Sequence, residues 1–243
     1  MAFLQPRRGF PPAKPGNRPA LQCRVRLVHH ACLSLCLFFI TSLTHAAQPP
    51  VRKAYAKNGA LYVVGANGKA KQLSGFSRVK EAALSPDRAH IAFIKGTMAK
   101  PISTGSGDAP ADQVWLAEAD GRLPTLLVTS KDAPDVKNIL GGLTAPCFAP
   151  NGQTVYFLSQ AYAVSDAIHA VDVATKAVRF VCAGNTVEVV TKGNFRGDLI
   201  VQQHRYHAGE GGAYDDYWLI NPRGKDIKRI GSEAQLRQFK ADL

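Results

Sequence analysis

Short apolar runs separated by turn-forming residues follow one another along most of this chain. From Arg52 onward, the runs are divided by Asn-Gly, Pro-Asp, Asp-Gly and Pro-Asn-Gly sequences. An Asn-Gly pair between two apolar runs, such as Asn58-Gly59, is a strong signal for a β-hairpin. Helical periodicity is almost absent. The pattern therefore predicts an all-β domain of short antiparallel strands.

The apolar runs locate the individual elements. One helical turn is expected within 135–140, and the tail 232–243, with Leu236 and Phe239 at helical spacing, predicts a short helix. The expected strands lie at 53–56, 60–64, 71–73, 79–84, 90–94, 114–116, 125–128, 146–148, 155–158, 168–171, 177–181, 187–190, 199–201, 217–220 and 227–230.

Two copies of one phrase indicate an internal repeat. LSPDRAHIAFIKG at 84–96 and FAPNGQTVYFLSQ at 148–160 both place a Pro-containing turn between two strands. The third strand of successive units begins near Asp112, Asp166 and Asp215. A four-stranded antiparallel unit recurring roughly every 45 to 65 residues is typical of propeller blades. We therefore predict a β-propeller-like array of about four blades, incomplete or closed, with a β-sandwich as the alternative.

These phrases resemble the WD-like propeller repeats of the TolB family of periplasmic proteins. The resemblance covers 53–231 and implies the fold, whereas one blade type serves scaffolds, receptors and hydrolases alike. The chain departs from the pattern in two respects. Only about three and a half blades are countable, where propellers have about four to eight. The last unit carries Gly-Asn-Phe-Arg-Gly at 193–197 in place of the Ser-Pro-Asp-Gly phrase.

The N-terminal segment predicts export. Arg24 and Arg26 precede an apolar run at 31–43, and Thr-His-Ala-Ala follows it. A positive flank, a short apolar core and small residues are typical of a secretory signal peptide. We expect cleavage before Ala47 or Gln48, a periplasmic location and no membrane span afterwards; a retained anchor is the alternative. The expected division is 1–46 basic, Pro-rich leader with signal peptide, 47–231 propeller-like domain and 232–243 short helix.

The charge distribution argues against a nucleic-acid partner. The 243-residue chain has a formal net charge of +12 from 30 basic and 18 acidic residues. Six of the basic residues and no acidic residue lie in 1–46, which leaves 24 basic residues against 18 acidic ones. No Lys/Arg run is dense enough to follow a phosphate backbone. We therefore expect no nucleic acid among the partners.

Two cysteines, Cys147 and Cys182, lie outside the leader, which itself contains Cys23, Cys32 and Cys36. An exported protein can form disulfides. If the two cysteines lie at opposite edges of one sheet, however, their Cα atoms are too far apart to be bridged. Pairing and non-pairing both remain open at this point.

The loops between second and third strands are the candidate site. In a propeller these loops open on the same face, so 96–112, 159–166 and 204–216 should gather on one rim. Long loops on a rigid scaffold are where binding residues concentrate. The candidate partner-binding residues are Asp108, Asp112, Tyr162, Tyr206, His207, Tyr214 and Asp215.

A metal site in the third loop is the alternative. His204, His207 and Glu210 offer imidazole and carboxylate ligands for a divalent metal. None of the common nucleophile, zinc-protease or nucleotide-binding motifs occurs, so we assign no catalytic residue and expect no cofactor. The leading hypothesis is a non-enzymatic module that binds an envelope protein or a cell-wall component. The second is a metal-assisted hydrolase or lyase.

Overall fold

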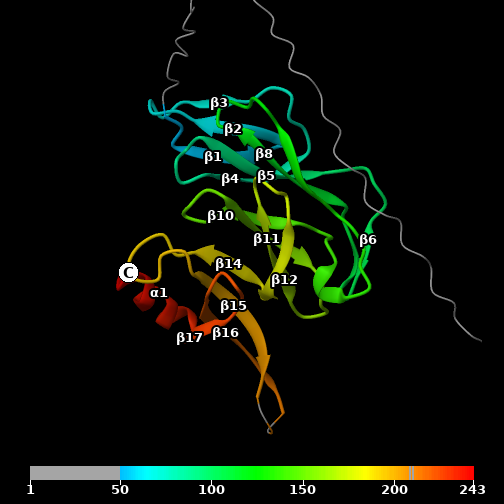
Figure 1. Ribbon diagram of the computed structural model, residues 1–243, viewed down its shortest axis with the longest axis vertical. Coiled ribbons are helices and arrows are strands. Elements are labelled where there is room, and N and C mark those ends of the chain that lie inside the picture. Colours follow the sequence, from blue (N-terminus) through cyan, green and yellow to red (C-terminus); the bar gives the residue numbers. More distant parts are fainter. Residues whose placement is uncertain (1–49, 208, 210) are drawn as a thin grey trace, which may run out of the picture. The chain divides into compact units, whose positions relative to one another are not determined.

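The computed structural model describes residues 50–207, 209 and 211–243, and residues 46–243 form one compact unit. Almost every element is a β-strand, as predicted (Figure 1). The first sheet contains β1 (Lys53–Lys57), β2 (Ala60–Val64) and β3 (Ala70–Gln72). The second contains β4 (Val79–Leu84), β5 (His90–Gly96), β8 (Asp112–Glu118) and β9 (Thr125–Thr129). The third contains β10 (Thr144–Phe148), β11 (Thr154–Gln160), β12 (Asp166–Asp172) and β13 (Val178–Ala183). The fourth contains β14 (Thr186–Val189), β15 (Leu199–Tyr206), β16 (Ala213–Ile220) and β17 (Asp226–Gly231).

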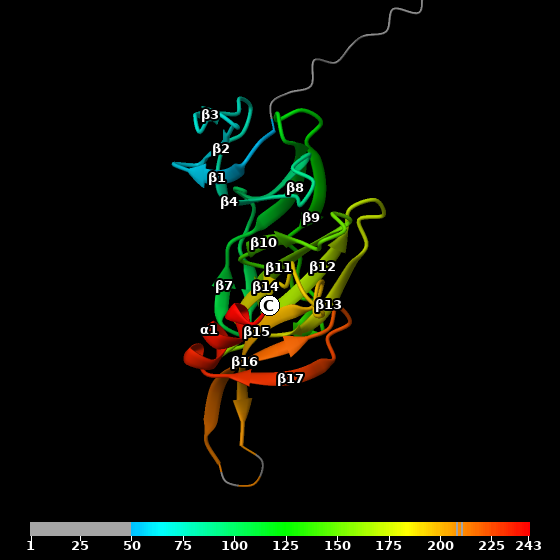
Figure 2. The ribbon, with the colours of Figure 1, turned by 90° about the vertical axis from the view of Figure 1, so that its left-hand side faces the viewer.

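Each of the last three sheets is a propeller blade in its topology. Its four strands are antiparallel and pair in sequence order. The first strands of these blades, β4, β10 and β14, lie side by side, and β1 lies against β4. Within the 46–243 unit the sheets thus follow one another in sequence order (Figures 1 and 2). The predicted repeat of four-stranded blades is confirmed.

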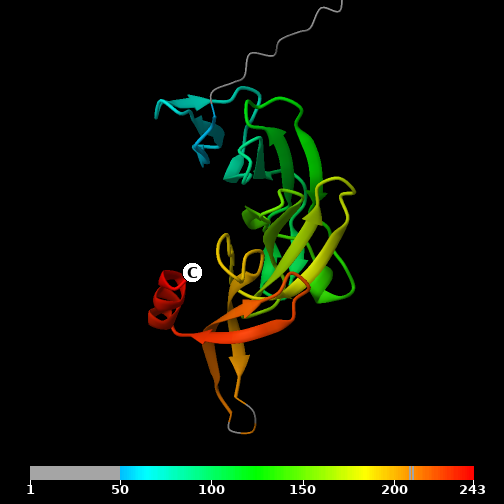
Figure 3. The same cartoon turned by 60° about the vertical axis from the view of Figure 1, so that its left-hand side comes forward.

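The array of sheets is open. The first sheet has three strands, and among the described residues no strand of the first sheet pairs with a strand of the fourth. Helix α1 (Glu233–Ala241) packs on the outer face of the fourth sheet, where Leu236 meets Ile200, Leu219 and Ile230 (Figure 3). Ser232 begins this helix with a capping box, in which its N–H donates to the Gln235 side chain at 2.8 Å. The helix occupies the face on which another blade would otherwise pack.

Apolar clusters between neighbouring sheets form the core. Phe93, Phe148 and Phe157 are buried there, as their place in the repeated runs suggests. Trp115 and Trp218 are only half-buried and lie at the margins of their clusters. Both tryptophans lie within apolar runs of the repeat, which by themselves predict core positions, but an indole ring is so large that it is rarely fully enclosed.

Cys147 and Cys182 are free thiols at opposite edges of the third sheet. Cys147 lies on the first strand, β10, and Cys182 on the last, β13, with two strands between them. The two cysteines therefore lie at opposite edges of one sheet, the arrangement that is too wide for a disulfide. Burial raises the pKa of each thiol to about 12.

Several expectations lie outside the described residues. These are the leader and signal peptide of 1–46, the cleavage point, the three leader cysteines and Glu210. Within the described part of the chain, no helix is long and apolar enough to cross a membrane.

Candidate functional site

The first two rim loops are joined to each other. The loop 96–112 was expected to lack strands, but it contains a hairpin of β6 (Ile102–Thr104) and β7 (Gly107–Ala109). The Gly105 N–H donates to the Ala161 carbonyl at 2.7 Å, and the Ser106 hydroxyl donates to the Tyr162 carbonyl. A Gly-Ser pair is a known two-residue hairpin loop, so the sequence did contain the signal for this hairpin. The contact across 56 residues was not predictable from it.

Asn185 links the second loop to the base of the third. Its side-chain oxygen accepts a hydrogen bond from the Asp166 N–H at 3.1 Å, and its own N–H donates to the Gln202 carbonyl at 2.8 Å. The first two predicted rim segments are thus hydrogen-bonded to each other, and Asn185 joins the second to Gln202, the residue just before the third. We call residues 96–112, 159–166 and 203–216 the rim.

The buried side chain of His169 lies close to the connection between β9 and β10 and holds it in place. This connection contains the short 3-10 turn η1 (Val136–Asn138), where one helical turn was predicted. The Nε2 of His169 lies 2.9 Å from the Lys137 carbonyl, and Nδ1 lies 3.2 Å from the Ser159 hydroxyl. Burial lowers the pKa of this imidazole. Both side chains are enclosed, so we interpret this Ser–His pair as a structural anchor.

The third rim segment is a two-stranded ribbon that projects beyond its sheet. Strands β15 and β16 stay paired as far as Tyr206 and Ala213, but β14 pairs only as far as Gln202 and β17 only as far as Tyr217. Residues 203–216 therefore have no neighbouring strand on either side within the described chain. The ribbon is visible as the hairpin at the foot of Figures 1–3. We expected a loop here; the strands extend because cross-strand pairing continues where burial ends.

The backbone groups along both ribbon edges point outward at known positions. Inward and outward backbone groups alternate along an antiparallel strand. The Gln202 carbonyl faces β14, where it accepts from Asn185, so His204 and Tyr206 present their N–H and C=O groups on the same side. On the other edge, Tyr217 pairs with β17. Asp215 and Ala213 lie two and four residues before it, so their N–H and C=O groups point to the same side, where no strand follows. Such edges can accept an additional strand.

One face of the ribbon is held against the fourth sheet. The Arg205 guanidinium stacks on the Trp218 ring at 3.5 Å and pairs with Asp226 at 2.8 Å. The Arg229 Nε donates to the Asp216 carboxylate at 2.6 Å. Both arginines thus fix the direction in which the ribbon projects.

The opposite face of the ribbon is exposed. The His204 Nδ1 lies 3.0 Å from the Asp215 carboxylate, and the Tyr206 ring stands edge-on to the His204 ring at 5.2 Å. The Tyr206 side chain is 70% exposed. A partner approaching this face would therefore meet an aromatic ring and a polar pair.

The remaining predicted residues have different surroundings. Asp108 is exposed in β7, and Tyr162 is half-buried. Asp112 is only 1% exposed, because Lys80 from β4 pairs with it at 2.7 Å, so its carboxylate is not presented to a partner. His207 is exposed with its ring 4.8 Å from the half-buried ring of Tyr214.

The proposed metal ligands are not brought together among the described residues. His204 lies with Tyr206 on one face of the ribbon, whereas His207 lies against Tyr214, which belongs to the other face. No cluster of three or more His, Cys, Asp or Glu side chains suited to a metal ion occurs in residues 50–207, 209 and 211–243. Glu210, the third proposed ligand, lies outside the description.

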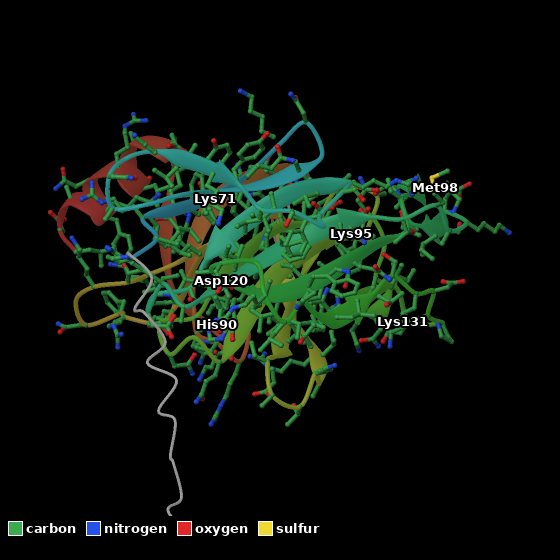
Figure 4. The ribbon with its side chains drawn as sticks, turned by 90° about the horizontal axis from the view of Figure 1, so that it is seen from above. Lys71, His90, Lys95, Met98, Asp120 and Lys131 are labelled. Atoms are coloured by element: carbon green, nitrogen blue, oxygen red, sulfur yellow. The ribbon has the colours of Figure 1, made fainter. Side chains whose placement is uncertain are left out.

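Each rim segment also presents one large exposed apolar side chain. Met98 is 82% exposed in the first, Val164 is 54% exposed in the second, and Tyr206 occupies the third. Figure 4 shows Met98 at the edge of the molecule, on the same side as Lys95 and Lys131. A shallow hollow of about 300 Å³, lined in part by Arg78, lies beside Met98.

Comparison with models of known protein families and with curated proteins finds no match. Solved structures resemble the chain at low identity. TolB from Acinetobacter baumannii aligns with a TM-score of 0.49 at 17% identity, over 74% of this chain and 41% of TolB. The β-propeller domain of the Trilobed protease from Pyrococcus furiosus, described as having an open velcro topology, gives 0.46 at 8% identity, over 74% and 57%.

An enzyme also occurs among these neighbours. XC5397 from Xanthomonas campestris, a gluconolactonase, gives a TM-score of 0.43 at 18% identity, over 72% of this chain and 56% of that one. The chain therefore spans about two fifths to three fifths of the length of these three neighbours. At such identities and scores the similarity says nothing about function, and the assignment of the fold rests on the order of the chain's own sheets.

Proposed function

We propose that this protein is a periplasmic binding module whose partner, an envelope protein or a cell-wall component, docks on the rim. The observation that carries the proposal is the projecting ribbon 203–216. It combines unpaired backbone edges with the exposed ring of Tyr206. Addition of a partner strand to an open sheet edge is a common mode of protein recognition.

An envelope protein fits this geometry better than a polymer of the cell wall. An extended segment of the partner would pair with the outward backbone groups of His204 and Tyr206, while its side chains contact the exposed ribbon face. The Tyr206 ring would be the anchor, because aromatic residues dominate the energy of most interfaces. Met98 and Val164 are exposed apolar side chains of the other two rim segments and could provide further contacts.

The test is co-purification from an envelope extract with three forms of the 46–243 unit. Tyr206→Ala removes the anchor, and His204→Pro removes an outward N–H that the hairpin does not use. Leu123→Ala is the matched control, because Leu123 is 73% exposed outside the rim. A partner that is retained by Leu123→Ala and lost by both other variants supports the proposal. Retention by all three variants would refute it.

The metal-assisted hydrolase or lyase remains the alternative. It rests on His204, His207 and Glu210, and the two histidine side chains would have to turn toward one another around an ion. Metal analysis of the purified protein addresses it directly. A stoichiometric divalent metal that is lost on His204→Ala would replace the binding proposal with the enzymatic one.

A further inference from the structure

The hollow beside Met98 lies at the end of the second sheet, where the chain arrives from the first sheet. One part of its lining comes from the link between β3 and β4, and the rest comes from the end of β5, the residues after it and the start of β8. We call it the rim hollow, because residues 96–98 belong to the first rim segment. Lys95 and Met98 can be followed in Figure 4. The lining includes Arg78, Lys95, Gly96, Thr97, Met98 and Gln113.

Two positively charged side chains line the rim hollow, and neither takes part in the ion pairs of the described residues. They are Arg78 and Lys95. No acidic side chain belongs to the lining. Asp112 follows the first rim segment closely, but Lys80 pairs with its carboxylate at 2.7 Å, so this pair adds no net charge. The rim hollow is therefore electropositive.

A third polar side chain of the rim hollow is oriented so that it can donate hydrogen bonds. The Gln113 side-chain oxygen accepts from the Trp115 indole N–H at 2.9 Å, which leaves the amide N–H groups for a ligand. Lys95 lies opposite Gln113 in the register, so the two side chains are neighbours on one face of the sheet. The Lys95 ammonium lies 5.4 Å from the centroid of the Trp115 ring. One indole thus helps to place both donors.

The backbone around the rim hollow is fixed by its own hydrogen bonds. Arg78 adopts a left-handed conformation, with φ at 57°, and its carbonyl accepts from the Gly96 N–H at 2.9 Å. The Thr97 N–H donates to the Ala111 carbonyl at 3.2 Å. Because these two N–H groups are already engaged, a ligand meets the side-chain donors rather than a nest of backbone N–H groups.

Three side-chain donors around one hollow match an oxyanion. We propose that the rim hollow binds a carboxylate. A guanidinium presents two parallel N–H groups that fit the two carboxylate oxygens, and an ammonium adds a point charge. Phosphate sites commonly use several backbone N–H groups, and those of Gly96 and Thr97 are engaged. Met98, 82% exposed at the margin, would contact the apolar part of the molecule that carries the carboxylate.

The carboxylate can belong to a free small acid or to an acidic residue of a protein that lies along the rim. The inference goes beyond the proposed function and does not depend on it. The donors belong to the second sheet and the link before it, whereas the ribbon 203–216 belongs to the fourth sheet. Loss of carboxylate binding would leave the addition of a strand to the ribbon untouched.

The test is a titration of the 46–243 unit followed by the NMR signals of its two indole N–H groups. Trp115 lies beside the rim hollow, and Trp218, the other tryptophan of the chain, is the internal reference in the fourth sheet. Succinate stands for a free acid, and the acetylated, amidated peptide Ala-Ala-Glu-Ala stands for an acidic residue of a protein. We expect at least one of them to shift the Trp115 signal alone, with a Kd in the millimolar range, and the tighter one identifies the source of the carboxylate. Succinamide should have no effect.

Three variants locate the binding. Arg78→Gln and Lys95→Gln should each weaken it at least about tenfold, because each removes a charge-assisted hydrogen bond. Gln113→Glu should do the same, because it replaces the donating amide by a second carboxylate of the same shape while the indole keeps its acceptor. The matched control is Lys225→Gln, which removes one exposed positive charge from the turn between β16 and β17 and should bind as the unchanged protein does.

Three outcomes would overturn the proposal. One is a Trp115 signal that neither carboxylate shifts. Another is an equal loss in Lys225→Gln, because net charge alone would then explain the binding. The third is inorganic phosphate that binds more tightly than both carboxylates and needs Arg78 and Lys95, which would assign the rim hollow to a phosphate group.

Discussion

Replacing Phe157 by alanine should destabilise the protein more than most other single changes, because Phe157 lies where two blades meet. Its side chain is fully buried on β11 and belongs to the cluster that contains Ile94 and Val114 of the second sheet. Its ring also stacks on the buried imidazole of His169, with centroids 5.5 Å apart and an interplanar angle of 20°. One substitution therefore removes contacts on both sides of the junction.

The expected cost follows from these surroundings. Truncation of a buried phenylalanine to alanine costs about 3–5 kcal/mol, and an aromatic stack adds about 0.5–1.5 kcal/mol. The strands around Phe157 are held by their ladders and cannot close around the cavity, so we expect a loss of about 4–5 kcal/mol. For a domain of this size the melting temperature should fall by about 8–20 °C.

Urea unfolding of the 46–243 unit, followed by tryptophan fluorescence, measures this loss. Phe180→Ala is the matched control, because Phe180 is half-buried and touches the same His169 edge-on, with ring centroids 5.9 Å apart. We expect the control to lose about 1–2 kcal/mol. A loss below about 1 kcal/mol for Phe157→Ala, or one no larger than that of the control, would show that the blades do not pack around this ring.

Three further predictions concern other parts of the structure. Burial lowers the pKa of His169, so just below pH 6.5 the unfolded chain binds more protons than the folded one. The free energy of unfolding should therefore decline as the pH falls from 6.5 toward the lower pKa of the folded state. Urea midpoints of His169→Gln should decline less over the same pH range. Cys147 and Cys182 should both react with a thiol reagent once the protein is unfolded, and should react with it slowly at pH 8 while the protein is folded. Oxidised cysteines in the non-reduced protein would contradict this. At Gly105, an added Cβ would lie 2.6 Å from the Ala161 carbonyl oxygen, so Gly105→Ala should separate the first two rim loops and speed amide hydrogen exchange in both, with β17 unchanged as the internal reference. Unaltered exchange in both loops would show that their contact is dispensable.

The strands were predictable because their signals are local. The phrase at 84–96 forms the end of β4, a tight turn and β5, with Leu84 opposite Ile91. The predicted strands are mostly shorter than the observed ones, because an apolar run records only the part of a strand that is buried. At β15 the apolar residues end at Val201, but pairing with β16 continues to Tyr206. Hydrogen bonds between strands sustain this extension, and hydropathy does not report them.

The candidate site was predictable only in part. The gathering of the second-to-third-strand loops on one rim followed from the repeat, and Tyr206 is exposed there as expected. The burial of Asp112 was not foreseeable, because its partner Lys80 is 32 residues away and reaches it only after β4, β5 and β8 have paired. The division of His204 and His207 between two faces likewise depends on how far the ribbon continues.

The sequence by itself determined the blades, because alternation along a strand and the conformation of a tight turn depend on residues close together in the chain. Tertiary structure alone decided how the blades are finished and connected. It placed α1 on the outer face of the fourth sheet and Gly105 against Ala161. These features depend on contacts between residues far apart in the chain. Such contacts exist only after the sheets have stacked, and no local pattern encodes them.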